Sequence, residues 1–153
     1  MTKNPEETKK IGNYLAGLLK PGDIILFFGE LGSGKTCLTQ GIAATMKVKE
    51  MVNSPSFTII NEYHGKFPIY HFDLFRLNSF YELYDLGYEE YFYGDGITIV
   101  EWAEKIDQNL PFEYLKIIIT FLDQKKRKIE FSPIGERYEQ LIKEFKKYEN
   151  IRN

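Results

Sequence analysis

One octapeptide has the residue types and spacing of a phosphate-binding loop. It runs Gly29-Glu30-Leu31-Gly32-Ser33-Gly34-Lys35-Thr36 and matches the pattern G-x-x-x-x-G-K-[ST] without a mismatch. Glycines let the backbone curl so that successive N–H groups point at phosphate oxygens, and the N-terminus of a following helix adds positive potential there. We therefore expect the Lys35 ammonium to reach the outer phosphates of a nucleoside triphosphate, and the Thr36 hydroxyl to ligate Mg²⁺.

Two acidic residues each follow an apolar run that is typical of a buried strand. Asp73 comes after Ile69-Tyr70-His71-Phe72, and Glu101 comes after Ile97-Thr98-Ile99-Val100. Because the carboxyl ends of strands in an open α/β sheet face the ligand crevice, both carboxylates are placed to approach Mg²⁺. The second run resembles a Walker B strand that ends in Glu rather than the usual Asp. Strand-end acids are also common as solvated termini, but the phosphate loop favours a catalytic set of Lys35, Asp73 and Glu101.

The segment Ser54-Pro55-Ser56-Phe57-Thr58 lies between the helix after the loop and the next predicted strand. Switch segments of nucleotide hydrolases occupy this place, where hydroxyl groups sense the γ-phosphate or the metal. From these residues alone, an ordinary Ser/Pro turn is the simpler interpretation.

The phosphate loop stands between a predicted strand and a predicted helix, as its chemistry requires. Continuous apolar residues 24–28 predict a strand buried on both faces, and residues 35 to about 46 predict the helix. Upstream, Asn4-Pro5-Glu6-Glu7 has the residues of a helix start, and residues 11–19 follow helical spacing.

The later segments complete an α/β pattern. Predicted strands cover residues 58–63, 68–72, 97–100, 115–121 and 128–131. Ser79 and Glu82 predict a capping box for a short helix, and residues 136–148 predict a final amphipathic helix. This order predicts a three-layer α/β/α P-loop NTPase fold, with a central, mostly parallel sheet that also contains antiparallel strands. We expect a single P-loop ATPase domain over residues 1–153.

Length and composition restrict the class of protein further. The chain has 153 residues, of which 43% are hydrophobic and 27% charged, an ordinary globular balance. Its net charge of −2 does not suit a general nucleic-acid coat, so RNA contact should be local or carried by a partner. A single cysteine allows no internal disulfide, and no apolar run has the length of a signal core or membrane span. We expect a cytoplasmic protein without a membrane partner.

Two further runs each have two interpretations. The basic run Lys125-Lys126-Arg127-Lys128 suits either contact with RNA phosphates or, more simply, a solvated turn between strands. The aromatic residues between Phe80 and Tyr93 suit either a partner surface or the packing of a small helix on the sheet. His71 is interpreted as a strand residue.

Together, five segments resemble the small bacterial ATPases required for threonylcarbamoyladenosine modification of tRNA, the TsaE (formerly YjeE) family. The matching segments are Asn4-Pro5-Glu6-Glu7-Thr8, Gly29 to Thr36, Asn53-Ser54-Pro55-Ser56-Phe57-Thr58, His71-Phe72-Asp73-Leu74-Phe75-Arg76 and Val100-Glu101-Trp102-Ala103-Glu104. They occur in the family's order over nearly the whole chain. Many proteins share the loop, but the switch, the HFDLFR segment and the Glu-Trp pair together are specific. Ser56 stands where members often have Thr, and Ala103 where Pro or Ser is common.

This resemblance implies roles for individual residues. Thr36 and Glu101 would bind Mg²⁺, and Asp73 would be a catalytic or metal-shell acid. ATP would be bound by the loop residues Gly29, Glu30, Leu31, Gly32, Ser33, Gly34, Lys35 and Thr36, by Glu7 and Thr8 near the adenine, and by Trp102 and Lys125, with Ser54, Ser56 and Thr58 as the switch. The implied reaction is hydrolysis of ATP to ADP and phosphate. The implied partners are a threonylcarbamoyl transferase subunit and its dimerisation partner, and nucleotide turnover would reset the complex that these two form. The implied process is modification of ANN-decoding tRNAs, which this chain would contact only indirectly.

Three alternatives remain from the residues. A small-molecule kinase would clamp the transferring phosphoryl group with several arginines, whereas only Arg76 lies near a candidate site. A GTP switch would need an N-K-x-D motif, and the nearest string, Glu104-Lys105-Ile106-Asp107, lacks the Asn. A module that binds nucleotide without turnover is compatible with every motif described.

Overall fold

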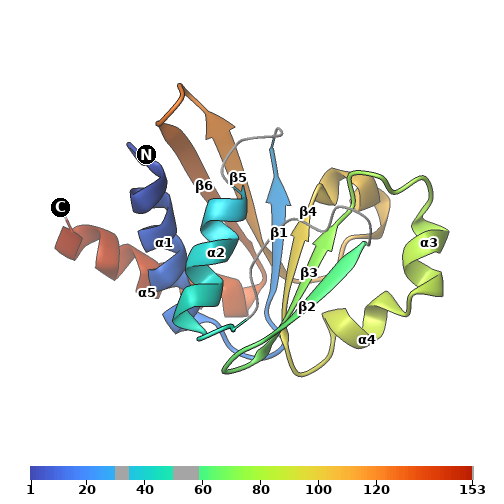
Figure 1. Cartoon of the computed structure of the whole chain (residues 1–153). Helices are drawn as coiled ribbons and strands as arrows, with labels where there is room; N and C mark the ends of the chain where they lie inside the picture. The colour runs from blue at the N-terminus through green and yellow to red at the C-terminus, as the bar shows by residue number, and fades with distance from the viewer. Residues whose placement is uncertain (30–34, 50–58, 153) are drawn as a thin grey trace.

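The computed structural model describes residues 1–29, 35–49 and 59–152 (Figure 1). Its elements are α1 (Pro5–Leu18), β1 (Ile24–Phe28), α2 (Lys35–Thr45), β2 (Ile60–His64), β3 (Pro68–Asp73), α3 (Phe80–Asp85), α4 (Tyr88–Phe92), β4 (Ile97–Glu101), the 3-10 helix η1 (Ala103–Asn109), β5 (Tyr114–Phe121), β6 (Arg127–Ile134) and α5 (Glu136–Arg152). Each predicted strand and helix has a counterpart here, whereas α4 and η1 were not predicted. Within the described ranges, no helix combines the length and apolar character needed to cross a membrane.

The six strands form one sheet in the order β2-β3-β4-β1-β5-β6. The four inner strands run parallel, while β2 and β6 pair antiparallel at the two edges. This confirms a mostly parallel sheet with antiparallel strands. Parallel strands place their carboxyl ends at one edge, so the sheet brings the ends of β1, β3 and β4 together.

Helices cover both faces of this sheet (Figure 1). Alternation along β1 sends Ile25 and Phe27 into a core that contains residues of α1, α2 and α5. It sends Ile24 and Leu26 into a second core, which contains residues of α3, α4 and η1. A strand buried on both faces reads as a continuous apolar run, as residues 24–28 do. The three-layer prediction is confirmed.

Helices α1 and α2 run parallel to each other. The backbone of Lys9 adjoins Gly41, and the Thr45 hydroxyl donates to the Asn13 carbonyl one turn further along both helices. At Gly41 a Cβ would collide with the Lys9 carbonyl, so glycine is what lets the helices approach so closely. The start of α1 therefore lies at the same end of the molecule as the start of α2.

Both predicted helix caps form, with one difference in their partners. The side chain of Asn4 accepts the N–H of Glu7 at 2.9 Å, and the hydroxyl of Ser79 accepts the N–H of Tyr81 at 3.2 Å. The prediction of a capping box at Ser79 was wrong in detail, because the Glu82 carboxylate accepts the N–H of Asn78 rather than that of Ser79. The cap still satisfies N–H groups that the first turn leaves unpaired.

Candidate functional site

The predicted phosphate loop joins the end of β1 to the start of α2. Gly29 has φ 140°, a backbone conformation that favours glycine, so the chain leaves the strand where the motif places its first glycine. Lys35 and Thr36 form the first residues of α2. The intervening Glu30, Leu31, Gly32, Ser33 and Gly34, and the predicted switch residues Ser54, Ser56 and Thr58, lie outside the described residues.

The two predicted acids lie side by side at the carboxyl end of the sheet. Asp73 and Glu101 are register partners in the parallel pair of β3 and β4, and the N–H of Leu74 donates to the Glu101 carbonyl at 3.1 Å. Glu101 is buried with 4% of its surface exposed, while Asp73 is half-buried. Residues 28 positions apart thus meet at one edge, next to the strand that leads into the phosphate loop.

Lys35 carries the most unusual charge of this edge. Its side chain is buried, with 5% of the residue exposed, and among the described residues its Nζ has no hydrogen-bond partner. Burial lowers the pKa of the ammonium, an effect that the nearby carboxylates of Glu101, Glu104 and Asp73 oppose. An unpaired buried ammonium is costly, and an anionic group that approaches Nζ would remove that penalty.

Trp102 covers the Lys35 ammonium. Nζ lies 4.2 Å from the centre of the indole ring, within the range of a cation–π contact. The ring of Phe75 lies 5.0 Å from the ring of Trp102. The Trp102 backbone has φ 61°, a left-handed conformation that is an outlier for a bulky residue. Such strain persists only where surrounding contacts hold it, and it occurs preferentially at functional sites.

The Asp73 carboxylate is held by the chain that follows it. Its Oδ1 accepts the N–H of Phe75 at 3.0 Å. Burial raises the pKa of Asp73 and Glu101 adds to this, although the Phe75 hydrogen bond and the nearby His71 and Lys35 act in the other direction. Asp73 is thus a partly desolvated acid beside a second carboxylate, an environment that a cation would relieve.

His71 contacts the Glu101 carboxylate, a pairing that was not predicted from the sequence. The Nε2 of His71 lies 2.7 Å from Glu101 Oε2, and its Nδ1 lies 3.3 Å from the Tyr63 hydroxyl. Because a carboxylate only accepts, Nε2 carries the proton in this contact. The available signal was a lone polar residue in an apolar strand, two positions before Asp73 and so on the same face.

The residues predicted near the adenine form a second group around the N-terminus. Glu7 accepts the Lys3 N–H at 2.7 Å, and the buried Thr8 hydroxyl lies 2.8 Å from that of Thr2. Thr2 also bridges to Arg127 of β6, next to the turn that carries Lys125 (Figure 1). The run 125–128 forms that exposed turn and the start of β6, held by Asp123, which accepts the N–H groups of Lys125 and Lys126.

The oxygen donors of Asp73, Glu101 and Thr36 fit a magnesium ion whose remaining ligands are phosphate oxygens and water. Two carboxylates, Asp73 and Glu101, and one hydroxyl, Thr36, are hard oxygen donors of the kind Mg²⁺ takes. In the part of the chain that the structure describes, no group of three or more His, Cys, Asp or Glu residues is arranged to hold a metal. Mg²⁺ commonly binds through one or two carboxylates plus phosphates and water, and this set could hold it in that way.

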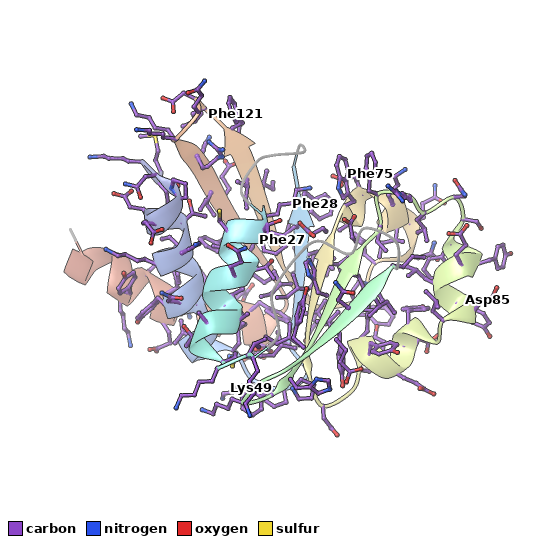
Figure 2. All side chains as sticks on the ribbon, viewed as in Figure 1. Phe27, Phe28, Lys49, Phe75, Asp85 and Phe121 are labelled. Atoms are coloured by element: carbon purple, nitrogen blue, oxygen red, sulfur yellow. The ribbon has the colours of Figure 1, made fainter. Side chains whose placement is uncertain are left out.

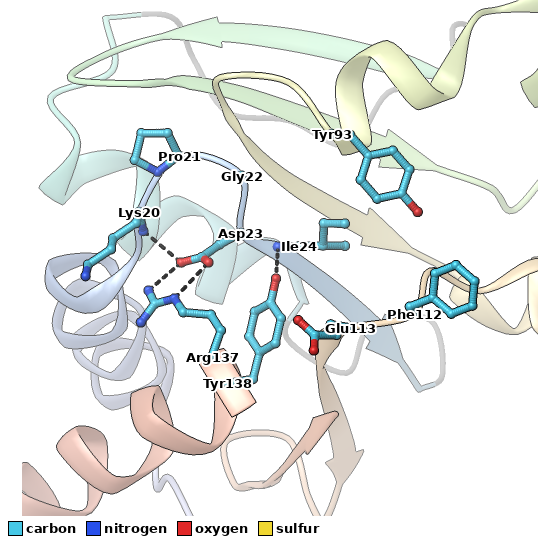
Figure 3. A pocket seen from close by; sticks show the side chains of 10 residues that line it. All are labelled: Lys20, Pro21, Gly22, Asp23, Ile24, Tyr93, Phe112, Glu113, Arg137 and Tyr138. Carbon is cyan, nitrogen blue, oxygen red and sulfur yellow. Dashed lines mark hydrogen bonds and ion pairs between the residues drawn. The ribbon is translucent and has the colours of Figure 1, made fainter. Parts of the chain in front are cut away.

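A separate pocket of about 480 Å³ lies at the amino end of the sheet (Figure 3). Figure 3 shows Arg137 and the backbone of Lys20 directed at the Asp23 carboxylate, and the Tyr138 hydroxyl directed at the Ile24 N–H. Burial raises the pKa of Tyr138 to about 12, so this hydroxyl stays protonated. The groups that these contacts join are satisfied by one another, which indicates a structural role for them.

A three-layer α/β fold with a G-x-x-x-x-G-K-T sequence between β1 and α2 defines the class of P-loop proteins. The model of the family described as threonylcarbamoyl adenosine biosynthesis protein TsaE matches residues 2–129. The chain therefore belongs to the TsaE family, as the resemblance implied.

Individual relatives and a solved structure agree with this assignment. The tRNA threonylcarbamoyladenosine biosynthesis protein TsaE of Bacillus subtilis (strain 168) is 46% identical over 99% of this chain and 96% of its own. The protein of that name from Treponema pallidum is 33% identical over 84% of this chain and 96% of its own. The crystal structure of Bacillus subtilis YdiB superposes with a TM-score of 0.80 at 40% identity, covering 95% of this chain and 91% of that one.

Proposed function

We propose that this chain is a magnesium-dependent ATPase required for threonylcarbamoyladenosine modification of ANN-decoding tRNAs. As a single cytoplasmic domain, it hydrolyses ATP to ADP and phosphate and thereby resets a threonylcarbamoyl transferase subunit and its dimerisation partner, which contact the tRNA. Family membership supports the process. The observation that carries the ATPase assignment is the buried Lys35 ammonium without a hydrogen-bond partner among the described residues, close to Asp73 and Glu101.

The proposed roles follow from charge and position. Lys35 attracts the outer phosphates, and Thr36, Glu101 and Asp73 hold Mg²⁺, which when bound offsets the negative charge on the phosphates. His71 keeps the Glu101 carboxylate in place through its Nε2–H. The remaining proposed nucleotide contacts are Gly29 to Gly34, Glu7, Thr8, Trp102 and Lys125, with Ser54, Ser56 and Thr58 as the switch.

Hydrolysis assays test this proposal directly. ATP and GTP turnover should be measured with Mg²⁺, with and without the transferase pair, using Glu101→Gln as the matched variant of equal size. We expect slow ATP turnover that the pair stimulates, and a variant that binds ATP but turns it over about 100-fold more slowly because the metal-binding carboxylate is gone. Wild-type turnover in Glu101→Gln would make Glu101 structural.

A nucleotide-binding module without turnover, a small-molecule kinase and a GTP switch are the alternative outcomes of these assays. Arg76, three positions after Asp73, is exposed, and a kinase would need more such groups at the phosphates. Phosphoryl transfer to a metabolite, or a preference for GTP, would overturn the ATPase proposal while leaving the phosphate loop intact.

A further inference from the structure

The outer side of α3 is both aromatic and exposed. Tyr81 and Tyr84 lie about one helical turn apart and expose 77% and 64% of their surfaces, and Leu86 after the helix exposes 46%. The inner sides of α3 and α4 pack on the sheet through Leu83 and Phe92, which are buried. The packing interpretation of the aromatic run therefore applies to the buried Phe92. The partner-surface interpretation stays open for the exposed Tyr81 and Tyr84.

The same region concentrates negative charge. Residues 77–104 contain no Lys or Arg, and their acids are Glu82, Asp85, Glu89, Glu90, Asp95, Glu101 and Glu104. Asp85, Glu89 and Glu90 are exposed, and no Lys or Arg within the described ranges forms an ion pair with them. Figure 2 shows Asp85 on the outer side of α3, directed away from the sheet.

We propose that Tyr81, Tyr84 and Leu86, together with the acids Asp85, Glu89 and Glu90, form a docking surface for a basic protein partner. We call these six residues the α3 surface, although Leu86 follows α3 and Glu89 and Glu90 belong to α4. Tyrosines provide large contact area with few rotatable bonds and are enriched among residues that dominate binding energy. The carboxylates repel nucleic-acid phosphates and anionic lipid, whereas a protein surface with Lys and Arg around an apolar patch complements both features.

The α3 surface is connected to the proposed nucleotide site through two short paths. Residues 74–79 join Asp73 directly to α3, and Phe75 in that segment packs on Trp102. Helix α3 also contacts η1, which begins immediately after Trp102. A partner that docks on α3 therefore adjoins both segments that carry the ends of β3 and β4, which provides a route from docking to turnover.

The test uses the full chain and the purified transferase subunit with its dimerisation partner, so the identity of this probe rests on the proposed function. We expect Tyr81→Ser/Tyr84→Ser to weaken the Kd at least about tenfold, and Tyr81→Phe/Tyr84→Phe to stay within about twofold of wild type. Glu89→Lys/Glu90→Lys should weaken binding about tenfold at 50 mM salt and less at 300 mM, because salt screens exposed charge. Glu139→Lys/Glu144→Lys on α5, with the same change of charge, should have little effect.

The possible outcomes separate this inference from the proposed function. If wild type does not bind the pair, both are overturned. If wild type binds and the α3 surface variants bind equally well, only the docking surface is overturned. Sedimentation that shows self-association of the wild type, abolished by Glu89→Lys/Glu90→Lys, would assign the surface to a second copy and overturn the proposal. Turnover without partners should be unchanged in every α3 surface variant.

Discussion

The two ends of the central sheet both bury charge, but they differ in how that charge is paired. At the amino end, the Asp23 carboxylate accepts hydrogen bonds from the Lys20 N–H and from Nε and a terminal nitrogen of Arg137. At the carboxyl end, the buried Lys35 Nζ has no hydrogen-bond partner among the described residues. The first arrangement is complete within the chain, whereas the second leaves the ammonium without a hydrogen-bond partner among the described residues, as the proposed binding of phosphate requires.

This difference is our reason for placing the proposed nucleotide site at the unsatisfied charge of Lys35 and not at the pocket of the amino end. The amino end has a pocket of about 480 Å³, but the charge of Asp23 there is already neutralised by Arg137. Buried polar groups in native proteins are normally paired, so an exception points to a ligand, to catalysis or to stored strain. Lys35 is such an exception, and it lies beside Trp102, whose backbone is strained.

The largest expected effect comes from removing the charge at the carboxyl end. Lys35→Ala should lower kcat/KM for ATP by about 100-fold or more, because the main cation facing the phosphates is lost. Lys35→Met is the matched control for packing, since it keeps an apolar chain against Trp102 without the buried charge. Its melting temperature should equal or exceed that of wild type. Normal turnover in Lys35→Ala would refute the phosphate-loop assignment.

The corresponding change at the amino end should affect stability instead of turnover. Arg137→Met leaves the Asp23 carboxylate buried without its cation, which should cost about 3 kcal/mol of unfolding free energy, as for other broken buried pairs. Urea unfolding measures this loss, and ATP turnover well below the melting temperature should stay within about twofold. Asp23→Asn/Arg137→Met should recover part of the stability, because no unpaired charge remains. If Arg137→Met is as stable as wild type, the pair of Asp23 and Arg137 does not stabilise the fold and the contrast between the two ends of the sheet is wrong.

The fold and the acids of the site follow from local sequence signals. A continuous apolar run before a glycine-rich loop has one favourable placement, the middle of a parallel sheet, which is where β1 lies. Asp73 and Glu101 then share an edge because parallel strands align their carboxyl ends. These inferences need only periodicity and strand direction, both of which can be determined from the chain itself.

Contacts between distant side chains could not be predicted in the same way. The pairing of His71 with Glu101 depends on the register between β3 and β4, which no local pattern specifies. Similarly, α4 spans five residues and η1 is a 3-10 helix, both too short for a periodic signal. The pairing of Asp23 with Arg137 joins residues 114 positions apart and was also not predicted.

A smaller effect on turnover should follow from loosening Glu101 without removing it. His71→Leu deletes the Nε2–H that lies 2.7 Å from Glu101 Oε2, and should lower turnover about tenfold while raising the Mg²⁺ concentration required. His71→Gln retains a donor of similar reach and should recover most of the activity. Mg²⁺ titrations of turnover, with ATP binding measured separately, distinguish these cases. Equal losses in both variants, with an unchanged Mg²⁺ requirement, would show that His71 serves packing alone.

The smallest expected effect concerns the stability cost of Asp73. Burial raises the pKa of this carboxyl above its ordinary value of 3.8, and Glu101 adds to the shift, against the Phe75 N–H, His71 and Lys35. A group whose pKa is raised on folding contributes stability that is fully present below its unfolded pKa and is lost as pH rises through its folded pKa. At neutral pH the ionised Asp73 therefore destabilises the fold.

Replacing Asp73 by Asn should relieve this cost. Asp73→Asn keeps an oxygen that can accept the Phe75 N–H, so its melting temperature at pH 7 should lie about 1–3 °C above that of wild type. The gap should narrow towards pH 4, where the wild-type carboxyl is increasingly protonated. Thermal unfolding between pH 4 and 8 measures both trends. If Asp73→Asn instead melts below wild type at pH 7, the Asp73 charge is stabilised within the fold, as the Asp23 charge is by Arg137. Asp73 would then differ from Lys35, whose ammonium has no hydrogen-bond partner among the described residues.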